Sequence, residues 1–411
     1  MHRARQGRCA LLKWRPAVEA LRSDGTPYGV DPQTGREGFP TLPLTALVLA
    51  PFLALGDLPG AIVWAVFKLA LAWWSVLTAL RLAAGRARDF PPWGVLIVVL
   101  LSARVLASDI AHGNINLPIA AVLIAAALAW SRGRTLQAGL WVGLGAVLKA
   151  TPLLFALYFL RKQSPRALAG TALGIGLFAF ALPGALLGWE RNLELAGGWW
   201  SQMARPYLWG APVTLMQSEH INQSLLGVLA RLTTDAVAIP ARPPEVPEDV
   251  RVNLLSLSPE GLRLLHRSAC ILVLLAVLWF SHALRSARAS AATLGEWAAV
   301  ALAMLMLSER SWKQHYVTLF LPLAFLAWHA LRSATPPRLR LIAWSGLAAS
   351  ALLHGLSGSG VLGPHGSDLA EAYGVFLWGG AALFAACGWI LRAAASESCG
   401  AVESPAQDRR P

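Results

Sequence analysis

The sequence predicts an all-α, polytopic transmembrane helical bundle with roughly 9–12 membrane segments. Of its 411 residues, 56% are hydrophobic and 14% are charged, whereas about a quarter of the residues of a soluble protein are charged. Apolar runs of roughly 17–25 residues recur along the chain, and a helix needs this length to cross a bilayer. The alternation of apolar and polar residues that marks a transmembrane barrel is absent, so the spans are expected to be helices.

Clusters of arginine and lysine predict which ends of the spans face the cytoplasm. The spans are expected, in chain order, at 60–80, 94–108, 113–130, 167–188, 267–285, 292–308, 315–331, 340–357 and 371–392. The basic clusters between them are Arg81/Arg86/Arg88, Arg132/Arg134, Arg161/Lys162/Arg166, Arg285/Arg288 and Arg332/Arg338/Arg340. The segments left on the outer side are 107–116, 189–266, 308–315 and 358–370. Because the net charge of +13 is concentrated in loops, no nucleic-acid partner is expected.

The predicted organisation has three parts. Residues 1–38 are interpreted as an N-terminal segment that forms a truncated outer loop. Residues 39–392 form the transmembrane domain, with 189–266 as its large outer loop, and residues 393–411 form a cytoplasmic tail that is expected to be disordered. The proline-rich stretch IPARPPEVPEDV in the outer loop is expected to be irregular.

Two apolar segments do not fit simple alternation. Residues 137–161 have basic clusters on both sides, so two short halves that meet near Lys149 and Pro152 are favoured, because proline interrupts a helix. The alternative is one ordinary span in which the lysine extends its ammonium to the interface. Residues 39–56 contain three prolines and either lie in the outer interface or form the first crossing.

Polar residues concentrate in three outer segments that are far apart in the sequence. The first supplies Asp109, His112, Asn114 and Asn116, the second supplies Asn222, Gln223 and Ser224, and the third supplies Arg310, Lys313 and His315. A carboxylate or an imidazole in this group is suited to deprotonate a hydroxyl acceptor. The cations Arg310, Lys313 and Lys149 are suited to hold a phosphate leaving group. No metal is expected, because no pair of ligands has metal-binding spacing, and no soluble nucleotide cofactor is expected, because phosphate-binding glycine motifs are absent.

The ordered motifs resemble those of glycosyltransferase family 87, whose members have the GT-C fold. The resemblance covers roughly residues 17–392 and rests on DPQTGREGFPTLPLTALVLAPF, HGNINL, AGLWVGLGAVLKATPLL, NQSLLGVLARL and SERSWKQHYVTLFLPL, in this order. It implies a polyprenyl-phosphate sugar donor and a catalytic pocket at the outer leaflet. By the same resemblance, Asn114 to Asn116 match a Gly-Gln/Asn-x-Asn segment, and Lys149 matches a Lys-x-x-Pro motif. His315 matches the second histidine of a frequent pair, and Asp109 matches a residue that accompanies the catalytic carboxylate.

One position departs from the family pattern. Family members begin with a transmembrane helix, followed by an acidic residue a few positions before an aromatic residue. In this chain the resemblance aligns Ala10 with the acidic position, before Trp14, and the first helix of the pattern is expected to be absent from residues 1–38. Glu19, Asp24 and Asp31 are the neighbouring carboxylates.

The preferred interpretation is a multi-pass membrane glycosyltransferase, expected in a bacterial plasma membrane with its active site facing outward. It is expected to transfer a hexose, most simply mannose, from a polyprenyl-phosphate donor to a hydroxyl of a lipid or glycan acceptor, among membrane lipids. Asp109 and His315 are the predicted catalytic residues. The residues predicted to bind substrate are His112, Asn114, Asn116, Lys149, Asn222, Gln223, Ser224, Arg310 and Lys313. The alternatives are a transporter or flippase of lipid-linked glycans and a catalytically impaired remnant.

Overall fold

A computed structural model describes residues 9–21, 23, 25–28, 38–205, 218–244, 246–281 and 290–400. The fold of these residues is all-α, as predicted. The only extended pairing among them consists of two isolated bridges, Ile239 with Val250 and Arg242 with Val246. These bridges lie in the proline-rich stretch that was expected to be irregular, so part of that stretch folds back on itself.

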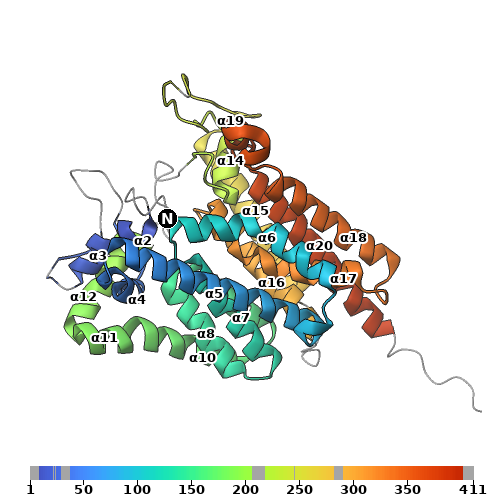
Figure 1. The fold of residues 1–411 in the computed structure, drawn as a ribbon, viewed down its shortest axis with the longest axis horizontal. Coiled ribbons are helices and arrows are strands. Elements are labelled where there is room, and N and C mark those ends of the chain that lie inside the picture. The colour runs from blue at the N-terminus through green and yellow to red at the C-terminus, as the bar shows by residue number, and fades with distance from the viewer. Residues whose placement is uncertain are drawn as a thin grey trace, which may run out of the picture.

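The chain forms helices of very unequal length (Figure 1). The first part contains α2 (Ala10–Lys13), α3 (Arg15–Ala20), α4 (Pro43–Ala54), α5 (Asp57–Ala84), α6 (Pro92–His112), α7 (Asn116–Ser131) and α8 (Thr135–Leu148). The middle part contains η2 (Thr151–Leu153), α9 (Leu154–Arg161), α10 (Pro165–Ile175), η3 (Gly176–Ala181), α11 (Leu182–Leu187), α12 (Trp189–Trp199), η4 (Trp200–Ala204) and α14 (Leu225–Thr233). The last part contains α15 (Pro259–Phe280), α16 (Ser290–Leu307), η6 (Lys313–Leu319), α17 (Phe320–Leu331), α18 (Pro337–Ser350), η7 (Ala351–Gly355), α19 (Ser359–Ala372) and α20 (Val375–Gly400). A single 3-10 turn, η1 (Ala87–Asp89), joins α5 to α6.

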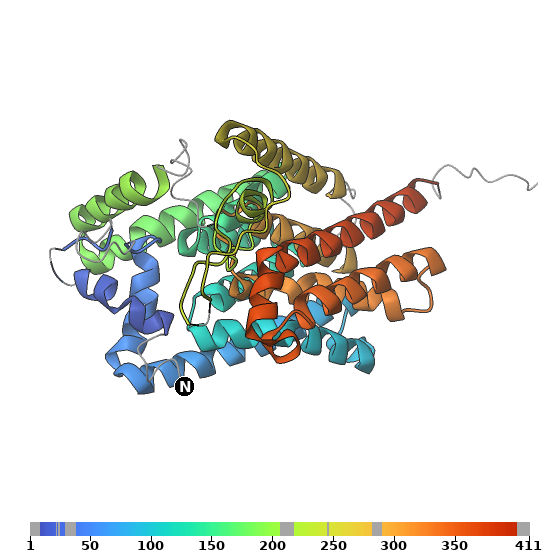
Figure 2. The same ribbon diagram turned by 90° about the horizontal axis from the view of Figure 1, so that it is seen from above.

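Helices α11 and α12 gather at one side of the molecule, and α18 and α20 lie at the other (Figures 1 and 2). Between these sides, α7 and α17 form the centre of the bundle, because both are apolar around most of their circumference and most of their residues are buried. The core therefore lies between helices that are far apart in the sequence, and these helices position the loops that were expected on the outer side.

Five helices within the described residues are long and apolar enough to cross a membrane, and a sixth candidate is the bent pair of Pro337–Gly355 and Ser359–Ala372. Five shorter apolar helices accompany them, so the polytopic helical bundle is present. Segment 137–161 is interrupted, as favoured from the sequence: α8 ends at Leu148 and α9 follows after the turn η2. Helix α4 has only 12 residues, which is too short for a full crossing at about 1.5 Å per residue.

Three expected boundaries differ from the structure. Residues 358–370, expected as a loop, form most of α19, which bends by 81° from the preceding helix. The outer loop 189–266 contains α12 and α14, and α15 already begins at Pro259, where Ser258 caps its first turn. The C-terminal tail is helical to Gly400, because α20 continues beyond the predicted span, and residues 401–411 lie outside the described part.

Glycines allow α8 and α10 to pack with their backbones in contact. A Cβ added to Gly170 would lie 2.2 Å from the backbone oxygen of Leu136, and one added to Gly139 would lie 2.0 Å from that of Ala167. Small residues at such positions let membrane helices approach closely. This packing fixes the direction in which α8 leads to the bend at Lys149.

Candidate functional site

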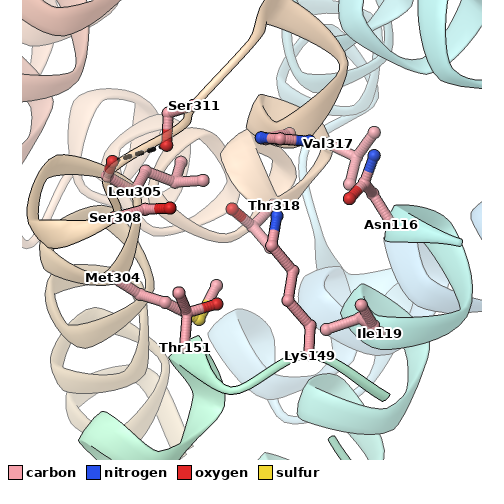
Figure 3. A pocket seen from close by; sticks show the side chains of 11 residues that line it. Asn116, Ile119, Lys149, Thr151, Met304, Leu305, Ser308, Ser311, Val317 and Thr318 are labelled. Atoms are coloured by element: carbon pink, nitrogen blue, oxygen red, sulfur yellow. Dashed lines mark hydrogen bonds between the residues drawn. The ribbon is translucent and has the colours of Figure 1, made fainter. Parts of the chain in front are cut away.

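A small cavity lies where α7, the bend after α8, the end of α16 and the turn η6 meet. About 20 Å³ of it is open to the centre of a water molecule, so the cavity as it stands has room for about one water molecule. Figure 3 shows the side chains around it. Its lining residues are Asn116, Ile119, Lys149, Thr151, Met304, Leu305, Ser308, Ser311, His315, Val317 and Thr318. Three of the predicted site residues, Asn116, Lys149 and His315, therefore line one cavity although nearly 200 positions separate the first from the last.

Lys149 reaches this cavity because the helix breaks at its position. Its backbone is extended, with φ −161° and ψ 129°, and Pro152 three residues later has no N–H with which to continue the helix. The side chain runs from the bend into the cavity (Figure 3). Across the residues that the structure describes, no hydrogen bond or ion pair is made by the Lys149 ammonium, which leaves it available to an anion.

His315 is held by the loop that precedes it. Its Nδ1 lies 3.1 Å from the carbonyl oxygen of Arg310 and 3.1 Å from the amide nitrogen of Trp312. No other hydrogen bond of the ring is found among the described residues. The backbone therefore fixes the Nδ1 edge of the imidazole ring. The other ring nitrogen, Nε2, remains available toward the cavity that this residue lines.

Asp109 is buried behind the cavity wall. Its carboxylate lies 2.6 Å from Nζ of Lys68, both side chains are 0% exposed, and the same ammonium donates to the backbone oxygen of Asp109 at 2.6 Å. The other carboxylate oxygen accepts a 2.9 Å hydrogen bond from Nδ2 of Asn116. Asp109 is not a lining residue, so in this conformation it orients Asn116 and does not face the cavity. Lys68, in the middle of a span, is the partner that sequence reasoning did not identify.

The residues that follow α6 are placed by a glycine. Helix α6 ends at His112, and Gly113 takes the left-handed conformation, with φ 73°, that terminates helices. Nδ1 of His112 lies 2.8 Å from the carbonyl oxygen of Ser108, and neither His112 nor Asn114 lines the cavity. The side chain of Trp64 donates to the carbonyl oxygen of Gly113 at 2.9 Å.

The N-terminal segment packs against this same glycine. A Cβ added to Gly113 would lie 2.4 Å from Sγ of Cys9 and 3.6 Å from the backbone nitrogen of Ala10. The position at which the family pattern has an acid therefore lies beside the 112–116 loop. Asp24 and Asp31, two of the alternative carboxylates, lie outside the described residues.

Asn222, Gln223 and Ser224 use their polar atoms on the backbone. The Asn222 amide donates to the carbonyl oxygen of Glu309 at 3.0 Å and accepts from the amide of Ser311 at 3.1 Å. Gln223 donates to two carbonyl oxygens and accepts from one amide. The Ser224 hydroxyl caps α14 and donates to the carbonyl oxygen of Glu309. None of the three lines the cavity.

The two basic residues of the third outer segment are also outside the cavity lining. Lys313 forms a 3.0 Å ion pair with Glu371, and Arg104 approaches the same carboxylate oxygen at 3.4 Å. Arg310 supplies its carbonyl oxygen to His315 and to Ser308. Desolvation raises the pKa of the neighbouring Glu309 to about 7, and the charge of Arg310 opposes this rise.

Hydroxyl groups of the cavity wall were not foreseen from the sequence. Thr318 is 3% exposed, and its hydroxyl is a buried polar group without a hydrogen-bond partner in the part of the chain that the structure describes. Thr151 lines the opposite wall (Figure 3). Single threonines in apolar runs are ordinary, so only the fold could identify them. Among the described residues, no group of three His, Cys, Asp or Glu side chains could hold a metal ion.

Residues 42–308 match the profile of glycosyltransferase family 87. The chain is 30% identical over 302 residues to the polyprenol-phosphate-mannose-dependent alpha-(1-2)-phosphatidylinositol mannoside mannosyltransferase of Mycobacterium tuberculosis. That alignment covers 70% of this chain and 62% of the relative, so the chain spans less than two thirds of the relative's length. No solved structure matches.

Proposed function

This chain belongs to glycosyltransferase family 87, and from that premise we propose that it is an integral-membrane mannosyltransferase. It transfers mannose from a polyprenyl-phosphate donor to a hydroxyl group of a lipid or glycan acceptor. The relative's name describes dependence on polyprenol phosphate mannose, which supports the donor class. The reaction takes place in the cavity beside Lys149, which opens toward the outer face of the membrane.

The observation that carries the proposal is the ammonium of Lys149, which makes no hydrogen bond or ion pair among the described residues. Lys68 and Asp109 neutralise each other in their ion pair, so Lys149 is left as the uncompensated charge of this group. A sugar–phosphate diester carries one negative charge, and its leaving phosphate gains a second as the bond to the sugar breaks. A fixed cation at this place therefore stabilises the transition state more than the bound donor, which is the requirement for catalysis.

His315 supplies the proton acceptor in this proposal. Nδ1 of His315 lies between the amide of Trp312, which can only donate, and the carbonyl oxygen of Arg310, which can only accept. In the tautomer with the proton on Nδ1, the ring donates to Arg310 and gives up the hydrogen bond from Trp312, and Nε2 then carries the lone pair that takes the proton of the acceptor hydroxyl. The acceptor oxygen then bonds to the anomeric carbon, the carbon–oxygen bond to phosphate breaks, and the polyprenyl phosphate leaves beside Lys149. Asn116, oriented by Asp109, and the hydroxyl of Thr318 supply hydrogen bonds to the sugar.

The direct test is transfer of radiolabelled mannose in membranes that contain the protein. Polyprenyl-phosphate mannose is the donor, and extracted membrane lipids are the acceptors. We expect labelled product with the wild type and a loss of about 100-fold or more with Lys149→Gln, since removing a transition-state contact of this kind costs factors of that order. Absence of transfer from every polyprenyl-phosphate hexose to every acceptor would disprove the proposal.

The outward location is tested separately by cysteine labelling. Single cysteines at His112, Glu219 and Lys313, none of which is buried, are expected to react with a membrane-impermeant reagent from the same, non-cytoplasmic side. Reaction from opposite sides would disprove a common outer site.

A further inference from the structure

The turn that contains Asn222 and Gln223 is polar but sealed. Gln223 is 0% exposed and Asn222 is 1% exposed. Beneath them lies Arg231 of α14, which is also 0% exposed and donates to five carbonyl oxygens, those of Ser218, Glu219, Asn222, Glu371 and Ala372. A buried guanidinium with this many acceptors fixes the backbone segments that supply them. It joins the turn that precedes α14, residues 218–224, to the end of α19.

The same turn holds the loop between α16 and η6 from the other side. The amide of Gln223 donates to the carbonyl oxygen of Ser311, and its own carbonyl oxygen accepts from the hydroxyl of Tyr316 at 2.9 Å. Asn222 bonds to the backbone at both Glu309 and Ser311. Glu309 and Ser311 are therefore bonded to this turn, and Arg310 between them contacts His315 in η6.

Loop 309–311 in turn determines where His315 lies. The carbonyl oxygen of Arg310 contacts Nδ1 of His315, and Ser311 is itself a lining residue of the cavity. Hydrogen bonds lead from Arg231 through the turn to Glu309 and Ser311, and the backbone of Arg310 between these two residues contacts the imidazole. No member of the turn touches the cavity.

We propose that Arg231, Asn222 and Gln223 are positioning residues, which hold loop 309–311 so that His315 faces Lys149 across the cavity. The expected change in kcat rests on the proposed function, whereas the expected displacement of His315 does not. It assigns the Asn-Gln-Ser turn to the alignment of the reacting groups and not to contact with the sugar. Since a displacement of about 1 Å costs on the order of 100-fold in rate, the effect is expected in kcat.

Two variants test the proposal by removing different numbers of hydrogen bonds. Gln223→Met keeps the side-chain length and removes all three side-chain hydrogen bonds, and Tyr316→Phe removes only the bond to the Gln223 carbonyl oxygen. Tyr158→Phe is the matched control, because it removes one buried hydrogen bond, to Glu296, in a part of the bundle that does not line the cavity. Folded protein is quantified for each variant by thermal unfolding in detergent.

Two measurements are made on each variant. The first is kcat and the donor KM for mannose transfer, and the second is the rate at which diethyl pyrocarbonate modifies His315, resolved by mass spectrometry. We expect Gln223→Met to lower kcat by about 10- to 100-fold with the donor KM within about twofold, and to speed modification of His315. Tyr316→Phe is expected to show the same changes to a smaller extent, and Tyr158→Phe is expected to show neither.

Three results would overturn the proposal. An increase in KM with unchanged kcat would mean that Gln223 contacts the substrate. If Gln223→Met leaves both kcat and the rate of His315 modification unchanged, at equal amounts of folded protein, the turn does not position the loop. If Tyr158→Phe changes kcat and His315 modification as much as Gln223→Met does, the changes reflect a general loss of stability. If the wild type transfers no sugar, the proposed function fails, and the His315 modification rates still decide whether the turn positions the loop.

Discussion

The buried pair of Lys68 and Asp109 gives the sharpest quantitative prediction. Both side chains are 0% exposed and their charged atoms are 2.6 Å apart. Removing one partner leaves the other as an uncompensated buried charge, which costs about 3–5 kcal/mol. We therefore expect Lys68→Met and Asp109→Leu each to lower the free energy of unfolding by this amount.

The double variant is expected to be more stable than either single variant. Replacing both members of a buried pair by apolar residues is often close to neutral. What remains in the double variant is the amide of Asn116 without its acceptor, and an unsatisfied buried donor costs about 1–3 kcal/mol. The two substitutions should thus be strongly non-additive.

Thermal and denaturant unfolding in detergent, arranged as a double-mutant cycle, measures this coupling. The pair of Arg15 and Asp57 is the matched control, because its side chains are 35% and 66% exposed and an exposed pair contributes about 1 kcal/mol or less. Losses that simply add in the Lys68→Met/Asp109→Leu variant would refute the interpretation. The same variant also separates two roles of Asp109, since it should retain measurable transfer if the carboxylate only orients Asn116 and none if it reacts.

Further predictions concern packing, charge and pH. Gly170→Ala places a Cβ 2.2 Å from a backbone oxygen of α8 and is expected to lower stability by about 1–3 kcal/mol, whereas Gly176→Ala, with open space around its Cβ, should unfold at nearly the wild-type temperature. Lys149→Arg is expected to retain more transfer activity than Lys149→Met at equal membrane levels, because it keeps the charge, and equal rates would argue against an anion site. His315→Ala should lower kcat by about 100-fold or more, measured in the same mannose-transfer assay. Because the pKa of Glu309 is raised to about 7 when folded, its contribution to stability is fully present below its unfolded pKa near 4.3 and is lost as the pH rises through about 7. This change in stability with pH is small because the Glu309 side chain is still open to solvent. In Glu309→Gln the unfolding temperature should therefore vary less between pH 5 and 8 than in the wild type.

Much of the fold was predictable because the bilayer restricts what an apolar chain can do. Long apolar runs predicted the five helices that are long enough to cross a membrane, and Pro152 predicted the break that brings Lys149 to the cavity. Three other expected spans are shorter in the structure: 113–130 and 292–308 correspond to the short apolar helices α7 and α16, and 315–331 is divided between η6 and the 12-residue α17. The helix α19 was missed because Gly358, Gly363 and Pro364 interrupt its pattern, although Gly363 only kinks it. The pairing of Lys68 with Asp109 could not be predicted, since 41 residues separate them and only packing of α5 against α6 joins them.

The candidate site shows why polar residues in an outer loop are ambiguous from sequence alone. A loop packed at a membrane surface must satisfy its own buried backbone groups, and polar side chains do this as readily as they bind substrates. Asn222 and Gln223 are occupied in this way, whereas Lys149 and the hydroxyl of Thr318 keep hydrogen-bonding capacity unused among the described residues. A residue type therefore identifies a candidate, but the bonds that it already makes within the chain decide whether it is available to a ligand. By this criterion we expect the chemistry of the protein to concentrate on Lys149, His315 and Thr318, and we infer that the turn at 222–224 acts on them through the backbone.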